Sequence, residues 1–217
     1  MSLTSLFSVL APRFGQRVRQ NERLANHTTL RLGGPADIWL AVEQVAELVE
    51  AVTLARKHAV PFFLLGGGAN LLISDAGIRG LVIENRARHL HFPPADRVAS
   101  GQPVTLVADS GVVLPNLARR CIKRGLSGLE WAVGVPGTVG GAVVNNAGAY
   151  GSDMALNLMR AELLSPGGER LWQPVEWFTY GYRTSRLKRQ DRTQAWVVLN
   201  VELGLTVAAP AEVAART

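Results

Sequence analysis

The sequence contains a single cysteine, Cys121, among its 217 residues. One thiol cannot form an intrachain disulfide, and it excludes any metal site built from several cysteines. The four histidines show no metal-ligand spacing, so we expect no bound metal. No apolar run approaches the length of a membrane span, and no positively charged stretch precedes the apolar start of the chain. We therefore expect a cytoplasmic protein that does not contact a membrane.

Long blocks of lysine and arginine are also absent, although the formal net charge is +6 at pH 7. The basic residues are dispersed, and the aromatic residues, 6% of the chain, do not lie among them. Surfaces that bind nucleic acid usually cluster their basic residues, so we expect no nucleic-acid partner. Dispersed arginines fit a solvated surface, and some of them fit a small anionic ligand.

The residues that are present predict an α+β chain with two halves. Apolar residues at helical spacing predict helices at 45–55 and 114–122, and place Cys121 on an apolar face as an inert packing residue. Short apolar or alternating stretches predict strands at 30–34, 61–65, 81–83, 104–108, 161–164 and 195–203. The domains that we expect are an amphipathic lead-in (1–25), two subdomains (26–85 and 86–205) and the truncated start of a further domain, which opens with a helix (206–217).

Glycine is abundant, with 22 residues, and it occurs in clusters. In the first cluster the apolar pair Leu64-Leu65 runs into Gly66-Gly67-Gly68-Ala69-Asn70 before apolar residues resume. A strand that ends in exposed backbone N–H groups makes a concavity suited to an anion. The cluster lacks the Lys-Ser/Thr ending of a P-loop and the G-x-G-x-x-G spacing of a dinucleotide motif, and alone it is equally typical of a plain glycine turn.

A second cluster, 134–151, combines recurring glycine with Val, Pro, Ala, Asn and Tyr and has almost no charge. Flexible linkers are not composed in this way. Small side chains let the backbone approach a flat ligand closely, while Asn and Thr supply neutral hydrogen bonds. Two such clusters, one in each half, predict a long ligand between the halves. A dinucleotide with a pyrophosphate fits, and uncharged surroundings suit an isoalloxazine ring.

Four ordered segments carry a specific resemblance. They are Asn26–Ala36 (NHTTLRLGGPA), Gly66–Leu72 (GGGANLL), Gly125–Glu130 (GLSGLE) together with 134–151, and Tyr180–Arg186 (YGYRTSR). Together they resemble the MurB family of flavoproteins, the UDP-N-acetylmuramate dehydrogenases, over residues 26 to about 203. The resemblance implies a two-subdomain FAD-binding fold of the vanillyl-alcohol-oxidase (PCMH) type. It also implies reduction of the enolpyruvyl group of UDP-N-acetylglucosamine enolpyruvate, with FAD as cofactor and NADPH as hydride donor.

The resemblance also implies roles for individual residues. Arg183 matches the family's catalytic arginine, which would stabilise the negative charge that hydride addition builds next to the substrate carboxylate. Tyr182 would orient the substrate. Neither glycine cluster contains a histidine or cysteine for covalent attachment, so we expect non-covalent FAD. The residues expected to bind it are Thr29, Gly33, Gly34, Gly66, Gly67, Gly68, Ala69, Asn70, Leu71, Gly134, Pro136, Gly137, Thr138, Gly140, Gly141, Ala142, Asn146, Gly148, Ala149 and Tyr150.

The family continues into a third domain that carries a proton-donating serine, a late glutamate and most contacts to the UDP-sugar, and the sequence has no counterpart of these. We therefore expect a fragment that binds FAD without full turnover. Two alternatives remain open at this point. One is an FAD-dependent oxidase of the same fold, whose reduced flavin would reoxidise rapidly in air. The other is a non-catalytic module whose glycine loops bind a nucleotide or an anion.

Overall fold

The computed structural model describes residues 3–94, 98–189 and 195–216. The chain divides into two compact units, one reaching to Ala87 and joined by Ala195, the other formed by Arg88 to residue 189 and Trp196 to Arg216. Each unit has a hydrophobic core of its own. The two units are described separately below.

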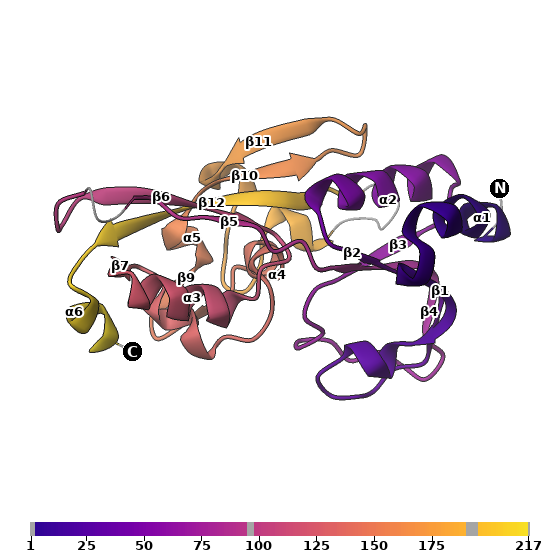
Figure 1. Ribbon diagram of the computed structural model, residues 1–217, viewed down its shortest axis with the longest axis horizontal. Helices are drawn as coiled ribbons and strands as arrows, with labels where there is room; N and C mark the ends of the chain where they lie inside the picture. Colours follow the sequence, from indigo (N-terminus) through magenta and orange to yellow (C-terminus); the bar gives the residue numbers. More distant parts are fainter. Residues whose placement is uncertain (1–2, 95–97, 190–194, 217) are drawn as a thin grey trace. The chain divides into compact units, whose positions relative to one another are not determined.

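The first unit is a four-stranded sheet with two helices on it (Figure 1). The strand order is β1-β2-β4-β3, with β1 antiparallel to β2 and with β4 parallel to both β2 and β3. The strands are β1 (Val18–Arg23), β2 (Pro35–Val42), β3 (Phe62–Leu65) and β4 (Ile78–Asn85). The two α-helices are α1 (Leu3–Phe14) and α2 (Val45–Lys57), and the unit also contains the short 3-10 helices η1 (Gly15–Arg17) and η2 (Leu24–His27).

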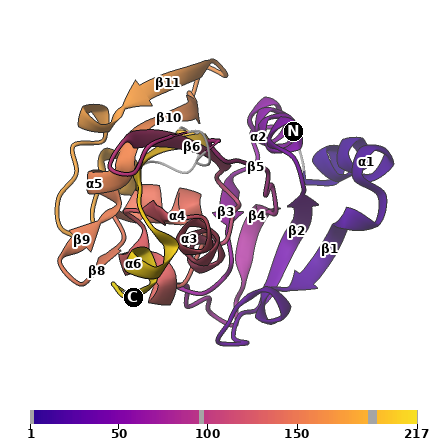
Figure 2. The same ribbon diagram turned by 60° about the vertical axis from the view of Figure 1, so that its left-hand side comes forward.

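Apolar periodicity explains the helix α2 and its position on the sheet. Its buried side chains, Leu48, Ala51, Val52 and Ala55, recur at helical spacing on one face, as the sequence predicts. Helix α1 continues through Pro12, which lies near its C-terminal end. Figure 2 shows α1 and α2 beside each other on the same side of this sheet.

The strand expected at 30–34 is wrong, because the first unit has its strand β2 at Pro35–Val42 instead. Arg31 has a φ of 54° and Gly33 a φ of 136°, and both values turn the chain out of the extended conformation that a strand requires. The lead-in, residues 1–25, contributes strand β1, which is polar and lies at the edge of the sheet. Its pattern lacks the apolar alternation by which a half-buried strand is found.

The second unit contains a larger antiparallel sheet in the order β11-β10-β12-β6-β5, with β7 paired to β12. Its strands are β5 (Leu90–His91), β6 (Pro103–Asp109), β7 (Leu126–Ser127), β10 (Leu158–Leu164), β11 (Arg170–Pro174) and β12 (Val197–Val207). A separate hairpin pairs β8 (Gly148–Ala149) with β9 (Ser152–Asp153). The helices are α3 (Leu114–Lys123), η4 (Glu130–Gly134), α4 (Val139–Asn145), α5 (Met154–Asn157), η5 (Val175–Phe178), η6 (Arg186–Arg189) and α6 (Pro210–Ala214).

The core of the second unit lies between this sheet and its helices (Figure 1). Helix α3 buries Leu114, Leu117, Ala118 and Cys121 on one face, as its periodicity predicts. Burial raises the pKa of the Cys121 thiol to about 12, so the thiol stays protonated at neutral pH. The expectation that Cys121 is an inert packing residue is confirmed.

The helix α4 inside the second glycine cluster was not foreseen from the sequence. Glycines at 140 and 141 disfavour a helix, by about 1 kcal/mol each relative to alanine. A local cap and a long-range contact offset this preference. The hydroxyl oxygen of Thr138 caps the helix by accepting from the N–H of Gly141, and the N–H of Gly140 donates to the carbonyl oxygen of Ser110 over 2.8 Å. Gly140 also packs so closely that an added Cβ would lie 2.8 Å from the Cβ of Ser110.

No helix in the described part of the chain is long and apolar enough to cross a membrane.

Candidate functional site

In the first unit, the first glycine cluster packs against the segment that precedes β2. The backbone N–H of Thr29 donates to the carbonyl oxygen of Gly68 over 3.0 Å. Gly68 has a φ of +64°, and a Cβ placed on it would lie 2.1 Å from the carbonyl oxygen of His27. Both the conformation and the close approach require glycine at this position. Two of the sequence motifs, distant along the chain, therefore meet in space.

The other residues expected to bind the cofactor in this unit fall into two groups. Thr29, Gly67 and Asn70 are exposed, and Gly66, Ala69 and Leu71 are half-buried. Gly33 and Gly34 are buried, and a Cβ on Gly34 would lie 1.9 Å from the carbonyl oxygen of Asp75. Packing inside the unit thus explains glycine at position 34. Cofactor contacts of all these residues stay predictions.

In the second unit, two glycines of the second cluster leave bare backbone facing open space, and a third has room for a Cβ. A Cβ added to Gly134 or to Gly137 meets no atom within 4 Å. A Cβ added to Gly141 meets only the hydroxyl oxygen of Thr138, at 3.5 Å. Gly137 also has a φ of +121°, which L side chains rarely adopt. An approaching planar molecule would find peptide groups without side chains at these positions.

The hairpin β8–β9 ends the second cluster and exposes an aromatic ring. Its two tip residues, Tyr150 and Gly151, have φ values of 52° and 78°, the signs of a type I′ turn. Gly148 is needed for the close approach of the two strands, since a Cβ there would lie 2.4 Å from the carbonyl oxygen of Ser152. Tyr150 is 93% exposed at the tip. Of the remaining expected residues, Ala142 is buried, Ala149 is half-buried and Pro136 is exposed.

The structure brings Arg183 onto this second cluster. Gly181 and Thr184 exchange backbone hydrogen bonds of 3.1 and 3.2 Å, which makes Tyr182 and Arg183 the tip of a tight turn. Arg183 has a left-handed φ of 54°, an uncommon conformation for a long side chain. Its guanidinium Nη2 donates to the carbonyl oxygen of Gly148 over 2.7 Å. The residue expected to be catalytic thus contacts the segment expected to bind FAD.

Two hydroxyl groups hold this turn to helix α4. The Oη of Tyr180 donates to the carbonyl oxygen of Val143 over 2.9 Å, and the Oγ of Ser185 donates to that of Val144 over 2.6 Å. Carbonyl groups in the last turn of a helix lack partners within the helix, so these hydroxyls satisfy them. Burial, with the charge of Asp153, raises the pKa of Tyr180, so its hydroxyl remains a donor.

The side chain of Asn146 joins the same parts of the unit. Asn146 ends helix α4 with a left-handed φ of 44°. Its Nδ2 donates to the Asp153 carboxylate over 3.0 Å and to the carbonyl oxygen of Gly181 over 3.1 Å. Its Oδ1 accepts from the N–H of Ala155 over 3.0 Å. These contacts give the Asn146 side chain a structural role, while its expected contact with the cofactor stays a prediction.

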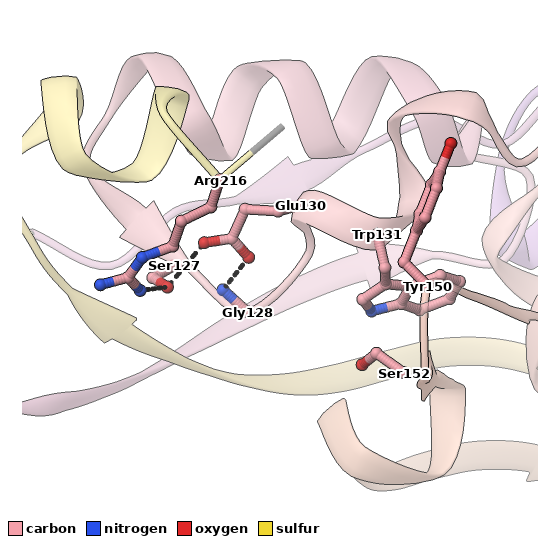
Figure 3. A pocket seen from close by; sticks show the side chains of 7 residues that line it. All are labelled: Ser127, Gly128, Glu130, Trp131, Tyr150, Ser152 and Arg216. Atoms are coloured by element: carbon pink, nitrogen blue, oxygen red, sulfur yellow. Dashed lines mark hydrogen bonds between the residues drawn. The ribbon is translucent and has the colours of Figure 1, made fainter.

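A pocket of about 440 Å³ lies in the second unit beside the exposed Tyr150 (Figure 3). It is lined by Ser127, Gly128, Glu130, Trp131, Tyr150, Ser152 and Arg216. The Glu130 carboxylate accepts from the Ser127 hydroxyl and from the N–H of Gly128, each over 2.7 Å. Both oxygens of this carboxylate therefore already accept hydrogen bonds from within the protein.

Several residues of this site were missed in the sequence. Tyr180, Ser185, Trp131 and Ser152 received no role there, because a hydroxyl that caps a helix or lines a pocket has no periodic pattern. The motif Tyr180–Arg186 was the one available signal. Among residues 3–94, 98–189 and 195–216, no group of three or more His, Cys, Asp or Glu could hold a metal ion.

Comparison with known proteins identifies the family of this chain. The family model described as "FAD binding domain" matches residues 36–173. The UDP-N-acetylenolpyruvoylglucosamine reductase of Rubrobacter xylanophilus is 43% identical over 196 residues, which cover 90% of this chain and 62% of that protein. The enzyme of the same name from Alkaliphilus oremlandii is 36% identical over 185 residues, covering 85% of this chain and 57% of that protein. The chain therefore spans little more than half the length of these relatives.

Solved structures support the same fold. The UDP-N-acetylenolpyruvylglucosamine reductase (MurB) from Thermus caldophilus superimposes with a TM-score of 0.71 and 31% identity, over 92% of this chain and 66% of that chain. A structure of alkyldihydroxyacetonephosphate synthase superimposes with a TM-score of 0.67 at 16% identity, over 95% of this chain and 44% of that chain. The second likeness concerns the fold alone. Together these findings confirm the expected α+β fold of the vanillyl-alcohol-oxidase type.

Proposed function

The chain belongs to the FAD binding domain family, and from this premise we propose that it is the flavin-binding part of a reductase of peptidoglycan precursor synthesis. The proposed substrate is the enolpyruvyl group of UDP-N-acetylglucosamine enolpyruvate, the product is UDP-N-acetylmuramate, and NADPH is the hydride donor. Relatives with 36% and 43% identity carry the corresponding reductase name, which supports this substrate class. The proposal includes a cytoplasmic location.

Each glycine cluster, taken by itself, has residues that suit one part of an FAD molecule. Bare backbone facing open space at Gly134 and Gly137 suits close approach by a flat ring system. We assign the pyrophosphate to the first cluster, Gly66–Asn70, where a strand end presents backbone without bulky side chains. Neither cluster contains a histidine or a cysteine, so the binding is non-covalent. Bound FAD supplies the hydride transfer that protein side chains cannot perform.

The observation that carries the proposed chemistry is the contact between Arg183 and the second glycine cluster. The guanidinium is held at 2.7 Å from the carbonyl oxygen of Gly148 and lies at the tip of a turn, where a substrate can reach it. In the proposed reaction, Arg183 binds the substrate carboxylate and stabilises the negative charge that develops when hydride adds to the neighbouring double bond. Tyr182, its 92% exposed neighbour at the tip, orients the substrate.

The test is substrate-dependent oxidation of NADPH by a form of the protein extended to the length of the relatives. R183A should retain its FAD and lose turnover by about 10²- to 10³-fold, the usual effect of removing one group that stabilises transition-state charge. R186A is the matched control, because Arg186 lies on the same segment but stacks on Trp177 at 4.8 Å. Unchanged turnover in R183A, or equal losses in both variants, would remove the assigned role of Arg183.

A further inference from the structure

In the first unit the imidazole of His27 lies between two carboxylates. Its Nε2 is 3.0 Å from Oε1 of Glu22, and its Nδ1 is 2.8 Å from Oε2 of Glu84. An ionised carboxylate only accepts hydrogen bonds, so each ring nitrogen has to be the donor. An imidazole donates from both nitrogens only while it carries its second proton. Both hydrogen bonds can therefore form at the same time only while His27 is cationic.

The surroundings of His27 make this cation part of a small charged network. The ring packs on the indole of Trp39, with centroids 4.6 Å apart, and the His27 side chain is 9% exposed. Arg19 and Arg86 lie over the same indole, each 5.5 Å from its centroid. The two carboxylates beside the imidazole thus also face guanidinium groups.

Each of the two carboxylates contacts both His27 and one arginine. Arg19 contacts Glu22 at 3.4 Å, while Arg86 contacts both oxygens of Glu84, at 2.7 and 3.0 Å. Burial by itself would raise the pKa of Glu22. Hydrogen bonds from His27, Asn26 and Arg19 outweigh that effect and hold the pKa below its usual value. Glu22 therefore remains an acceptor over a wide pH range.

The network is connected to the start and to the middle of the first glycine cluster. Glu84 on strand β4 pairs with Leu65 on strand β3, the residue directly before Gly66. At Gly68, an added Cβ would lie 2.1 Å from the carbonyl oxygen of His27, so the backbone of His27 packs directly against this glycine. The contact of His27 with Glu84 therefore ties the segment that supports Gly68 to the strand pair from which the cluster begins.

We propose that His27 is a positioning residue for FAD binding. Its doubly protonated imidazole, held by Glu22 and Glu84, keeps the Gly66–Gly68 loop in the conformation that binds the cofactor. Loss of the second proton replaces one hydrogen bond by a lone pair facing a carboxylate, which loosens the support of the loop. FAD affinity therefore falls as the pH rises. This inference rests on the proposed function only in taking the loop to hold FAD.

The experiment measures the Kd of FAD by fluorescence at a series of pH values from about pH 5 to about pH 9. For the unmodified chain we expect binding to weaken roughly three- to tenfold towards alkaline pH, the effect of about one lost hydrogen bond. H27Q should bind FAD more weakly at acid pH and show a flat profile. H58Q is the matched control, because His58 is buried in the same unit but contacts the hydroxyl of Ser5 instead of a carboxylate.

A second variant separates positioning from simple structural support. In E84Q the new side-chain amide can donate to an unprotonated ring nitrogen, so the second proton is no longer required. This variant should retain FAD affinity at alkaline pH and lose the pH dependence, and it decides the question if H27Q fails to fold. A flat profile in the unmodified chain, or an unchanged slope in E84Q, would overturn the inference. Failure of every form to bind FAD would instead overturn the proposed function.

Discussion

The side-chain amide of Asn146 joins the second glycine cluster to the turn of Arg183, since its Nδ2 lies 3.1 Å from the carbonyl oxygen of Gly181. Asn146 itself has a left-handed φ of 44°, which asparagine tolerates better than most residues do. Tyr150 within this cluster and Arg183, which contacts it, are left-handed as well. Strained backbone of this kind persists only where surrounding contacts hold it, and it is concentrated at functional sites.

Replacing Asn146 separates the backbone effect from the side-chain effect. N146G keeps access to the left-handed conformation and removes the three hydrogen bonds of the amide, so it should lower the free energy of unfolding by about 1–3 kcal/mol. N146A should cost roughly 1 kcal/mol more, because alanine resists the positive φ. Urea denaturation measures both values. Wild-type stability of N146G would show that the amide does not hold the turn.

The hydroxyl groups of Tyr180 and Ser185 should matter for the same reason. Y180F and S185A each leave one carbonyl group of helix α4 without its hydroxyl donor, which should cost roughly 1 kcal/mol of unfolding free energy per variant. The side-chain NMR signal of Arg183, assigned from its loss in R183K, should broaden in both variants. Y182F is the control, because Tyr182 is 92% exposed, and it should keep wild-type stability. A sharp, unshifted Arg183 signal in Y180F and S185A would contradict the account.

Gly68 provides a test of the first glycine cluster. G68A should abolish FAD binding and destabilise the first unit, because the new Cβ would lie 2.1 Å from the carbonyl oxygen of His27. G15A is the matched control, since Gly15 has a similar φ of +54° but no atom within 4 Å of the added Cβ. It should cost only the backbone strain, about 1–2 kcal/mol, and leave FAD affinity unchanged. Equal effects of the two variants would show that close packing at Gly68 is unimportant.

Replacing Gly141 with alanine should raise the stability of the unit and lower its affinity for FAD. This glycine lies inside helix α4 and is exposed, so G141A should stabilise the unit by up to about 1 kcal/mol. The same methyl group would occupy the bare backbone surface assigned to the flavin, so FAD should bind more weakly. Thermal unfolding without cofactor and FAD titration measure the two effects separately. A G141A chain that binds FAD as tightly as the unmodified chain would remove this face of α4 from the site.

The ion pair between Arg17 and Glu47 predicts a pH dependence of stability. Two hydrogen bonds of 2.8 and 2.7 Å from the Arg17 guanidinium hold the pKa of Glu47 below its usual value, against an opposing effect of burial. The stabilisation is therefore present above the unfolded pKa of about 4.3 and is lost as the pH falls through the folded value. E47Q should lose up to about 1 kcal/mol at pH 7 and almost nothing at strongly acid pH. A difference that persists in acid would contradict this.

The sequence predicted the parts of the fold that have apolar periodicity. Helices α2 and α3 and strands β3, β4, β6, β10 and β12 lie where spacing of apolar residues indicates them. Strand β1 and helix α4 were missed, because pairing at a polar sheet edge and capping by Thr138 determine them and neither leaves a periodic pattern. The candidate site is predicted from its glycine clusters and the Arg183 motif. The hydroxyls of Tyr180 and Ser185, which fix the geometry, became visible only in three dimensions.

The central claim is that the two charge-poor glycine clusters of this chain bind FAD. Titration of FAD into the purified chain, followed by flavin fluorescence with circular dichroism as a check on folding, tests it most directly. The account predicts saturable binding of one FAD per chain, released unchanged on denaturation, and loss of that binding in G68A. A chain that is folded, colourless and unable to take up added FAD would contradict it.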